Sequence, residues 1–265
     1  MKKYSFGFIG CGNMGGALAT AVANAIGGER IAVNDFCLEK AKAFEKYGCS
    51  VLSANELVKN CKFLVLGVKP QNMQETVQSL AESAKENQAL CVITMAAGIS
   101  TSAIKKYFGY DLPVIRIMPN TPAMLGQGMI LYTLSSVSQS DENDFLSAFA
   151  KAGVCDKIPE EKIDAASALS GCGPAFVYAF AEALADGAVE CGVPRDQAAK
   201  YAAQTLKGAA EMLLEFGHPA QLKDAVCSPG GTTIAGIHAL ENAGFRGAVM
   251  DAVTSAYKRT LELKK

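Results

Sequence analysis

Short, almost continuously apolar runs recur through the first 135 or so residues, and helix-like stretches separate them. Each run has the length and the glycine or polar flanks of a strand that is buried on both faces. The runs that predict strands are residues 4–10, 31–35, 63–68, 90–95 and 114–118.

The stretches between these runs have the spacing of apolar and polar residues that is typical of helices. The helix candidates are residues 12–25, 38–47 and 72–84. Because strands and helices alternate, the pattern predicts an α/β fold with a Rossmann-like, doubly wound parallel sheet.

The pattern changes near Lys157-Ile158-Pro159, after which alanine-rich helical segments follow one another. Pro174 and Pro194 each suit a first helical position, where a missing N–H costs nothing. The pattern therefore predicts two domains, residues 1–159 with the sheet and residues 160–265 with helices only. The helices expected in the second domain are residues 162–169, 174–191, 194–216, 219–226, 231–242 and 245–263.

Several of these helices are apolar and small around most of their circumference, for example over residues 175–190 and 201–216. A domain of about 105 residues has too little volume to cover such helices alone. We therefore expect a second subunit to cover them.

The composition is that of an ordinary globular protein, with half of the residues hydrophobic and 19% charged. The net charge is −1, and the basic residues are scattered without a dense run. This excludes an electrostatic footprint for nucleic acid or an anionic membrane, so a small molecule is the expected partner.

The amino-terminal apolar stretch is short and broken by glycine, unlike a secretory signal. No stretch approaches the ~20 uninterrupted apolar residues that span a bilayer. We expect a cytoplasmic protein without a membrane partner.

Nine cysteines are spread from Cys11 to Cys227. Their number is odd, and no CxxC pair or zinc-ligand spacing occurs among them. We interpret them as mostly buried thiols in a reducing compartment, and we expect no metal site.

The segment GFIGCGNMGG, residues 7–16, has five glycines in ten residues between a strand candidate and a helix candidate. The spacing Gly10-x-Gly12-x-x-Gly15 is that of the dinucleotide fingerprint: a tight turn, close approach to a pyrophosphate, and helix–strand packing. The helix would then offer free N–H groups to the phosphates. Glycines that serve helix packing alone are the alternative.

Asp35 ends the second strand candidate, 20 residues beyond Gly15. A carboxylate in this place pairs with ribose hydroxyls and repels a 2′-phosphate, which favours NADH over NADPH. Two alternatives stay open: Asp35 caps the helix near Leu38, or one of Lys40 and Lys42 reaches a phosphate.

Three more loops follow strand candidates at the edge where doubly wound sheets bind ligands: GVKPQN (67–72), MAAGIS (95–100) and MPNTPA (118–123). Lys69 could lie beside the nicotinamide ribose or the phosphates, or be a solvated lysine. Asn120 and Thr121 suit a carboxamide or a substrate, or form a rigid turn. The candidate cofactor-binding residues are Gly10, Gly12, Asn13, Met14, Gly15, Asn34, Asp35, Val68, Lys69, Pro70, Ala97 and Asn120.

Two glycine-rich elements precede helices in the second domain, SGCGPAF (170–176) and CSPGGTTIAG (227–236). The N–H groups of Gly231, Thr232 and Thr233 would converge there as an anion nest suited to a carboxylate. Tight helix connectors are the alternative.

The segments FIGCGNMGGALA, GVKPQ, RIMPNTPA, SGCGPAFVY and HPAQLKDAVCSPGGTTIAGIHALE together resemble the pyrroline-5-carboxylate reductase family, from Ser5 to about Leu261. The resemblance implies reduction of 1-pyrroline-5-carboxylate to proline with NADH or NADPH. It places the substrate carboxylate on Gly230, Gly231, Thr232 and Thr233, with the Thr233 hydroxyl near the ring nitrogen. It also implies a homodimer formed through the helical domain, and often a decamer.

One departure from the family concerns the cofactor. Many members have a small or basic residue after the second strand to receive the 2′-phosphate of NADPH, whereas this chain has Asn34-Asp35. The cofactor is therefore expected to be NADH or NADPH, with NADH favoured.

A protonated cyclic imine is already an electrophile, so the reaction needs no strong protein acid. Of the two histidines, His218 and His238, the first precedes Pro219 and is expected to cap a helix. Catalysis would occur in the cleft between the domains through orientation and electrostatics, with Thr233 as the candidate catalytic residue.

Three alternatives remain. Another imine reductase would share the same features. The opening FIGCGNMG and the helical second domain also resemble the β-hydroxyacid dehydrogenases; that resemblance implies a lysine on the first long helix of the second domain, and residues 174–190 contain none. A non-catalytic nucleotide sensor has no need of a carboxylate nest.

Overall fold

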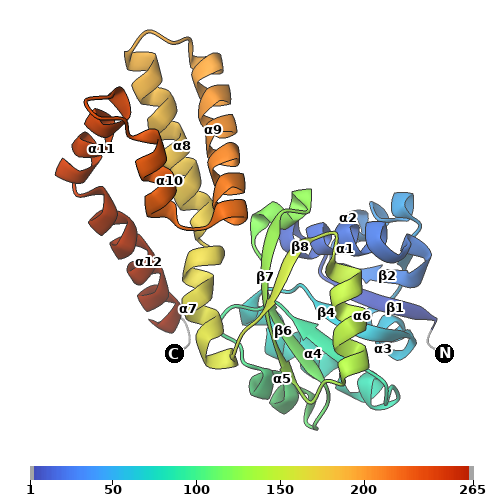
Figure 1. Cartoon of the computed structure of the whole chain (residues 1–265). Coiled ribbons are helices and arrows are strands. Elements are labelled where there is room, and N and C mark those ends of the chain that lie inside the picture. Colours follow the sequence, from blue (N-terminus) through green and yellow to red (C-terminus); the bar gives the residue numbers. More distant parts are fainter. Residues whose placement is uncertain (1–2, 263–265) are drawn as a thin grey trace. The chain divides into compact units, whose positions relative to one another are not determined.

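One sheet of eight strands, in the order β3-β2-β1-β4-β5-β6-β7-β8, forms the centre of the amino-terminal part of the chain (Figure 1). The computed structural model describes residues 3–262. Strands β1 to β6 are parallel and follow the Rossmann order; β7 runs antiparallel to β6, and β8 is parallel to β7. The strands are β1 Tyr4–Ile9, β2 Ile31–Asn34, β3 Ser50–Val51, β4 Cys61–Leu66, β5 Cys91–Thr94, β6 Val114–Met118, β7 Gly128–Ser135 and β8 Gly153–Lys157.

The five strands predicted from the apolar runs are confirmed, with ends that move by at most two residues. The prediction missed β3, β7 and β8. Strand β3 has only two residues, and β8 is a partly exposed edge strand without an apolar run. Strand β7 does carry an apolar run, so its signal was present in the sequence.

Helices cover both faces of the sheet, which confirms the doubly wound fold. Side chains of β4 alternate between two cores: Phe63 and Val65 pack with α1 and α6, whereas Leu64 and Leu66 pack with α3, α4 and α5. The helices of this part of the chain are α1 Asn13–Ile26, α2 Leu38–Lys42, α3 Ala54–Asn60, α4 Pro70–Lys85, α5 Thr101–Phe108, α6 Gln139–Phe149 and α7 Glu160–Ser170, with 3-10 turns η1 Gly28–Arg30, η2 Glu45–Tyr47 and η3 Thr121–Leu125.

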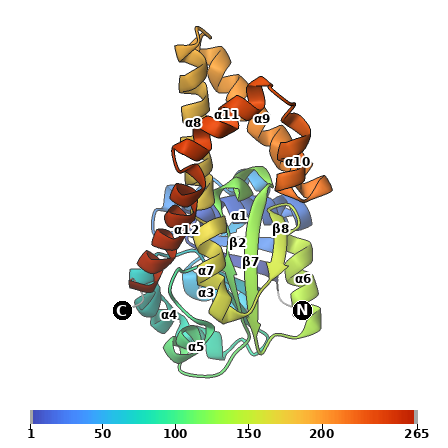
Figure 2. The same cartoon turned by 60° about the vertical axis from the view of Figure 1, so that its left-hand side comes forward.

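The chain divides into two units, of which the first holds the sheet and extends to Cys172, with residues from Ala256 onward added to it. Helix α7 belongs to this unit because it packs along β7 (Figure 2). Its Ile163 is buried against Met118 and Leu131 of the sheet. The predicted domain boundary after residue 159 stays a prediction.

The second unit, Gly173–Ser255, consists of helices. Helices α8 and α9 lie side by side in it and bury Ala185, Ala198 and Ala202 between them (Figure 2). Many of its large apolar side chains stay exposed in the single chain, among them Tyr178, Leu214 and Met250. The helices are α8 Gly173–Glu190, α9 Arg195–Phe216, α10 Pro219–Val226, α11 Thr232–Asn242 and α12 Phe245–Glu262, which begins in this unit.

Every helix predicted after residue 160 is present, with ends within two residues of the prediction; residue 263 lies outside the described part. The two prolines sit one position away from the expected place. Helix α8 begins at Gly173, before Pro174, and Pro194 is the N-cap of α9.

Among the described residues, one helical stretch, Glu160–Glu190, is long and apolar enough by composition to cross a membrane. It comprises α7 and α8, and 11% of its apolar window is buried. Helix α7 is a core helix of the first unit, since Asp164 on it is 3% exposed and forms an ion pair with Arg116 of the sheet. The stretch Glu160–Glu190 resembles a membrane-spanning helix by length and composition only.

A buried ion pair fixes α7 on the sheet. Arg116 of β6 is 2% exposed, and its Nη2 lies 2.7 Å from Oδ1 of Asp164. Glu160, at the start of α7, lies 3.5 Å from the same guanidinium and accepts hydrogen bonds of 2.8 Å from both the N–H and the hydroxyl of Thr101. The pair thus ties β6, α5 and α7 together.

Removing one partner of this pair leaves an uncompensated buried charge. Asp164→Asn is expected to lower the free energy of unfolding by about 3–5 kcal/mol, measured by urea denaturation at fixed protein concentration. Glu82→Gln, which breaks the exposed pair with Lys85, is the control and should cost about 0–1 kcal/mol. Equal losses in the two variants would contradict this role of the pair.

Candidate functional site

The glycine loop joins β1 to α1 and has the tight turn that the spacing predicts. Gly10 has φ +98°, a conformation that L side chains rarely adopt. Its N–H donates to the carbonyl of Asn34 at 2.8 Å, and the N–H of Gly67 donates to the carbonyl of Ile9 at 2.8 Å. The ends of β1, β2 and β4 are thereby bound together at the carboxyl edge of the sheet.

Three glycines of this edge are in direct backbone contact. A Cβ on Gly10 would lie 2.7 Å from the carbonyl of Gly67. One on Gly15 would lie 2.1 Å from the Gly10 oxygen, and one on Gly67 would lie 2.6 Å from that same oxygen. None of the three positions accepts a side chain without movement of the backbone.

Gly12 differs from the other three, because a Cβ there would meet no atom within 4 Å. It is the N-cap of α1, has no side-chain cap, and is followed by a first turn without an acidic residue. The first backbone hydrogen bond of the helix runs from the N–H of Gly16 to the carbonyl of Gly12, at 2.7 Å. The N–H groups of Asn13, Met14 and Gly15 therefore remain available to an anion.

Asp35 turns its carboxylate toward this loop. Its Oδ2 accepts from the N–H of Cys11 at 2.6 Å, and its Oδ1 accepts from the N–H of Cys37 at 2.9 Å. The second bond is an Asx turn just before α2, whose N-cap is Cys37. The carboxylate is held beside the glycine loop, as a ribose-binding acid requires. The alternative, that Asp35 caps the helix near Leu38, is wrong, because the N-cap of α2 is Cys37.

A hollow of about 350 Å³ adjoins the glycine loop. Cys11, Gly12 and Asn13 form one side of it, and Lys40 and Lys46 contribute cations from the segment after β2. The hollow thus has the start of α1 and two lysines in its lining.

The other predicted cofactor residues differ in solvent exposure and in the hydrogen bonds that their side chains already make. Lys69 is exposed at the N-cap of α4, with Pro70 as the first helical residue, and Ala97 is exposed in the loop after β5. Val68 is half-buried. Asn120 is already engaged: its Nδ2 donates to the carbonyl of Ser170 and its Oδ1 accepts from the N–H of Met129, both at 2.9 Å.

The bonds of Asn120 favour the rigid-turn interpretation of that segment. They hold the carboxyl end of α7 against the start of β7. Asn34 is likewise engaged, since its Nδ2 donates to the carbonyl of Leu52 at 2.7 Å.

The SPGGTT segment of the second unit forms a turn followed by a helix. The N–H of Gly231 donates to the carbonyl of Ser228 at 3.0 Å, and Gly230 has φ +69°. Pro229 and Gly230 thus occupy the central positions of a type II turn. Gly231 is the N-cap of α11 and makes no side-chain capping bond.

Helix α11 therefore begins with unused donors. Its first turn has no acidic residue, and the next described bond runs from the N–H of Ala235 to the carbonyl of Gly231. The groups left for a ligand are the N–H groups of Thr232, Thr233 and Ile234, because that of Gly231 serves the turn. Sequence reasoning missed Ile234, which the helix N-terminus rule would have found.

The other glycine-rich element, residues 170–173, is a connector. The N–H of Gly171 continues α7 by donating to the carbonyl of Ser167 at 2.8 Å, and α8 begins at Gly173. His218 is the N-cap of α10 at φ +39°, but its side chain makes no capping bond, so the predicted capping by this side chain is wrong.

All nine cysteines lie in the described part of the chain, and no disulfide joins any two of them. Burial raises the pKa of the Cys11 thiol to about 12, and the nearby Asp35 carboxylate adds to the shift. The prediction of mostly buried thiols is only partly correct: four are buried, three are half-buried, and Cys172 and Cys191 are exposed. Residues 3–262 hold no cluster of three or more metal-ligating side chains.

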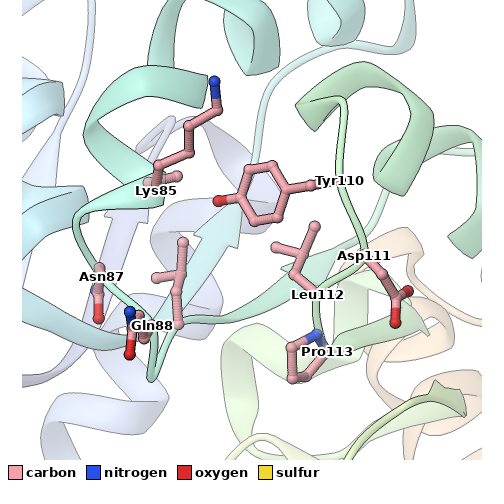
Figure 3. A pocket seen from close by; sticks show the side chains of 9 residues that line it. Lys85, Asn87, Gln88, Tyr110, Asp111, Leu112 and Pro113 are labelled. Carbon is pink, nitrogen blue, oxygen red and sulfur yellow. The ribbon is translucent and has the colours of Figure 1, made fainter.

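Another pocket of about 310 Å³ lies at the amino ends of β5 and β6 (Figure 3). Lys85, Gln88, Tyr110 and Asp111 surround it. Because the glycine loop follows the carboxyl end of a parallel strand, this pocket is at the opposite edge of the sheet and is no part of the candidate site.

Two families match parts of the chain. Pyrroline-5-carboxylate reductase dimerisation matches residues 160–263, and NADP oxidoreductase coenzyme F420-dependent matches residues 5–98. The first match covers the helices with the exposed apolar side chains, and the second covers the glycine loop.

Similar proteins extend over the full length. The pyrroline-5-carboxylate reductase of Glycine max is 43% identical over 269 residues, which cover 99% of this chain and 97% of that protein. The solved pyrroline-5-carboxylate reductase of Coxiella burnetii is 33% identical with a TM-score of 0.91, covering 99% of both chains. That of Plasmodium falciparum, with NADP bound, is 31% identical with a TM-score of 0.88, covering 100% of both chains.

The contrast between Gly12 and Gly15 yields a paired prediction. Gly12→Ala should leave the urea midpoint unchanged but weaken NADH binding about tenfold or more, since its Cβ occupies the space open to a pyrophosphate. Gly15→Ala should lower the free energy of unfolding by about 1–3 kcal/mol, because its Cβ collides with backbone. Titration of NADH fluorescence and urea denaturation measure the two effects; equal behaviour of the variants would contradict the assignment.

Proposed function

Since this chain belongs to the pyrroline-5-carboxylate reductase family, we propose that it reduces 1-pyrroline-5-carboxylate to L-proline with hydride from NADH or NADPH. The observation that carries the proposal is a pair of helix N-termini, at α1 and α11, each preceded by glycine and each with unused N–H groups. Phosphates and a carboxylate are the anions that this reaction brings.

We assign the cofactor to the carboxyl edge of the sheet. The N–H groups of Asn13, Met14 and Gly15 would bind the pyrophosphate, with Gly10 and Gly12 shaping its approach. Asp35, next to Asn34, would hold the adenosine ribose. The exposed positions Lys69 and Ala97, with Val68 and Pro70, would line the nicotinamide half, and Asn120 would support this edge through its two internal bonds.

We assign the substrate carboxylate to the start of α11. Thr232, Thr233 and Ile234 would donate their N–H groups, while Gly230 and Gly231 form the turn that leaves this end open. A carboxylate at such an end is stabilised by about 0.3–1 kcal/mol through the helix dipole, in addition to its hydrogen bonds. Thr233 also carries a hydroxyl that can bond to the ring nitrogen.

The chemistry of the step asks little of acid or base groups. A reduced nicotinamide supplies the hydride when it is bound. The residues of this chain bind and orient: the α11 donors hold the carboxylate, and the Thr233 hydroxyl keeps its bond to nitrogen as the imine becomes an amine. Orientation and fixed dipoles of this kind lower a barrier without proton transfer.

NADH is the preferred cofactor in this proposal. The Asp35 carboxylate is fixed by two backbone N–H groups, so it cannot turn away from a 2′-phosphate. Lys40 and Lys46 line the adjoining hollow and are the groups through which a phosphate would be accepted instead.

The proposed assembly is a homodimer, with a decamer as its larger form. The dimerisation match covers the helices that stay exposed in the single chain, including α8 and α9. It begins at residue 160, which supports the proposed domains of residues 1–159 and 160–265, whereas the packing of α7 on the sheet puts the division of the structure after Cys172. The cytoplasm is the proposed location, in keeping with nine cysteines that form no disulfide in the described part of the chain.

Two other functions fit less well. A β-hydroxyacid dehydrogenase would need a lysine on α8, and Gly173–Glu190 contains none. A non-catalytic nucleotide sensor would not explain the unused N–H groups at the start of α11.

The direct test of the activity mixes the protein with 1-pyrroline-5-carboxylate and NADH or NADPH in turn. Loss of reduced-cofactor absorbance, with formation of proline, is the expected outcome, and it should be faster with NADH. Absence of turnover with both cofactors would contradict the proposed function.

The Thr233 hydroxyl is tested by Thr233→Ala, with Thr233→Ser as the control that retains the hydroxyl. The alanine variant should lower kcat/KM for the imine on the order of tenfold, as expected for one lost hydrogen bond, while the Kd of NADH is unchanged. Normal turnover in the alanine variant would remove Thr233 from the reaction.

The charge of Asp35 is tested by Asp35→Asn, whose single amide oxygen can accept from only one of the two N–H groups, of Cys11 and Cys37, that the carboxylate oxygens accept from. The ratio of kcat/KM for NADPH to that for NADH should rise on the order of tenfold, because the repulsion of the 2′-phosphate is removed. Asp35→Ser should shift the ratio in the same direction. An unmoved ratio in both variants would show that selectivity lies elsewhere.

A further inference from the structure

Phe36 is the most exposed large apolar side chain described in the protein, with a relative accessibility of 109%. It directly follows Asp35, at the carboxyl edge of the sheet. Full burial of a phenylalanine side chain is worth about 1.5–3 kcal/mol, so the folded chain forgoes that stabilisation at this position.

The backbone around Phe36 is held in place. Asp35 accepts from the N–H of Cys11 through one oxygen and from the N–H of Cys37 through the other. Phe36 is thus the central residue of an Asx turn whose two ends are fixed, one of them to the glycine loop. The turn presents the ring to solvent and leaves the backbone little freedom to withdraw it.

We propose that Phe36 is the surface on which the adenine ring of the dinucleotide stacks. The inference rests on the proposed function, in which Asp35 holds the adenosine ribose. Adenine is joined to that ribose at C1′, on the side away from the pyrophosphate. An aromatic ring one residue beyond the ribose-binding acid is therefore within reach of the base.

A second protein chain is the other occupant to weigh. The family match that concerns dimerisation covers residues 160–263, and Phe36 lies outside it. Leu38, two positions on, is also an exposed apolar side chain, but Glu39 and Lys40 after it are exposed charges, and the buried centres of protein interfaces are depleted of charged residues. Adenine, which offers an aromatic face of similar size, fits this surrounding better.

Stacking on the base has a consequence that separates Phe36 from Asp35. NADH and NADPH carry the same adenine, so Phe36 should strengthen the binding of both equally. Asp35 should discriminate between them. Affinity and selectivity of the adenosine end are thus assigned to two adjacent residues.

The experiment compares Phe36→Ala, Phe36→Leu and Phe36→Trp by fluorescence titration with NADH and with NADPH. The alanine and leucine variants should raise both Kd values about fivefold or more, the range of base–aromatic stacking, and the tryptophan variant should retain affinity. Val154→Ala, which shortens an exposed apolar side chain of β8 outside the dimerisation match, is the matched control and should change neither value.

Reduced nicotinamide mononucleotide, which lacks the adenosine, is the second probe. Its affinity should be the same for the wild type and for Phe36→Ala. In turnover, Phe36→Ala should raise KM for NADH without changing kcat.

The outcomes separate the two proposals. If the wild type binds neither NADH nor NADPH, the proposed function itself fails. If the wild type binds them and Phe36→Ala binds them as tightly, the stacking role is overturned. A change of assembly size in Phe36→Ala, measured by sedimentation, with unchanged Kd values would assign Phe36 to a protein interface instead.

Discussion

Backbone-to-backbone contact among Gly10, Gly15 and Gly67 is the constraint on which the rest of the nucleotide end depends. The three residues belong to the loop after β1, the first turns of α1 and the loop after β4, and a Cβ on any of them would collide with backbone of this group. Because no side chain separates these elements, α1 begins close to the sheet and its amino end is aimed over the strand edge. Gly12 is then left with open space in front of it.

The same physical device appears at the start of α11. A type II turn with Gly230 at its φ-positive position consumes the N–H of Gly231, and the first turn of the helix has neither a side-chain cap nor an acid. Most helices need a cap because their first N–H groups lack acceptors. Other described helices also lack a side-chain cap, but α1 and α11 combine a glycine at the N-cap with a first turn that has no acidic residue. In a chain with full-length likeness to pyrroline-5-carboxylate reductases, a reaction between two anionic ligands explains both ends.

Much of this was present in the sequence because it depends on local patterns. The apolar runs predicted the parallel strands, the fingerprint spacing predicted the turn at Gly10, and the alanine-rich segments predicted the helices to within two residues. What the sequence could not supply were contacts over long separations. The pairing of Arg116 with Asp164 joins residues 48 positions apart and assigns α7 to the sheet unit.

The sequence also could not predict which polar side chains are already hydrogen-bonded within the protein. Asn120 looks like a free ligand in the sequence, yet both ends of its amide are used, by Ser170 and Met129. The exposure of Phe36 depends on the Asx turn of Asp35, which a pattern of apolar and polar residues does not specify.

Direct transfer of hydride from a nucleotide to a small imine is the central claim, and isotope transfer tests it. The protein would be incubated with 1-pyrroline-5-carboxylate and NADH that carries deuterium in both positions at C4 of the nicotinamide, and the proline would be examined by mass spectrometry and NMR. One deuterium per proline, located at C5, is expected. Proline without deuterium would contradict direct transfer, as would the absence of proline.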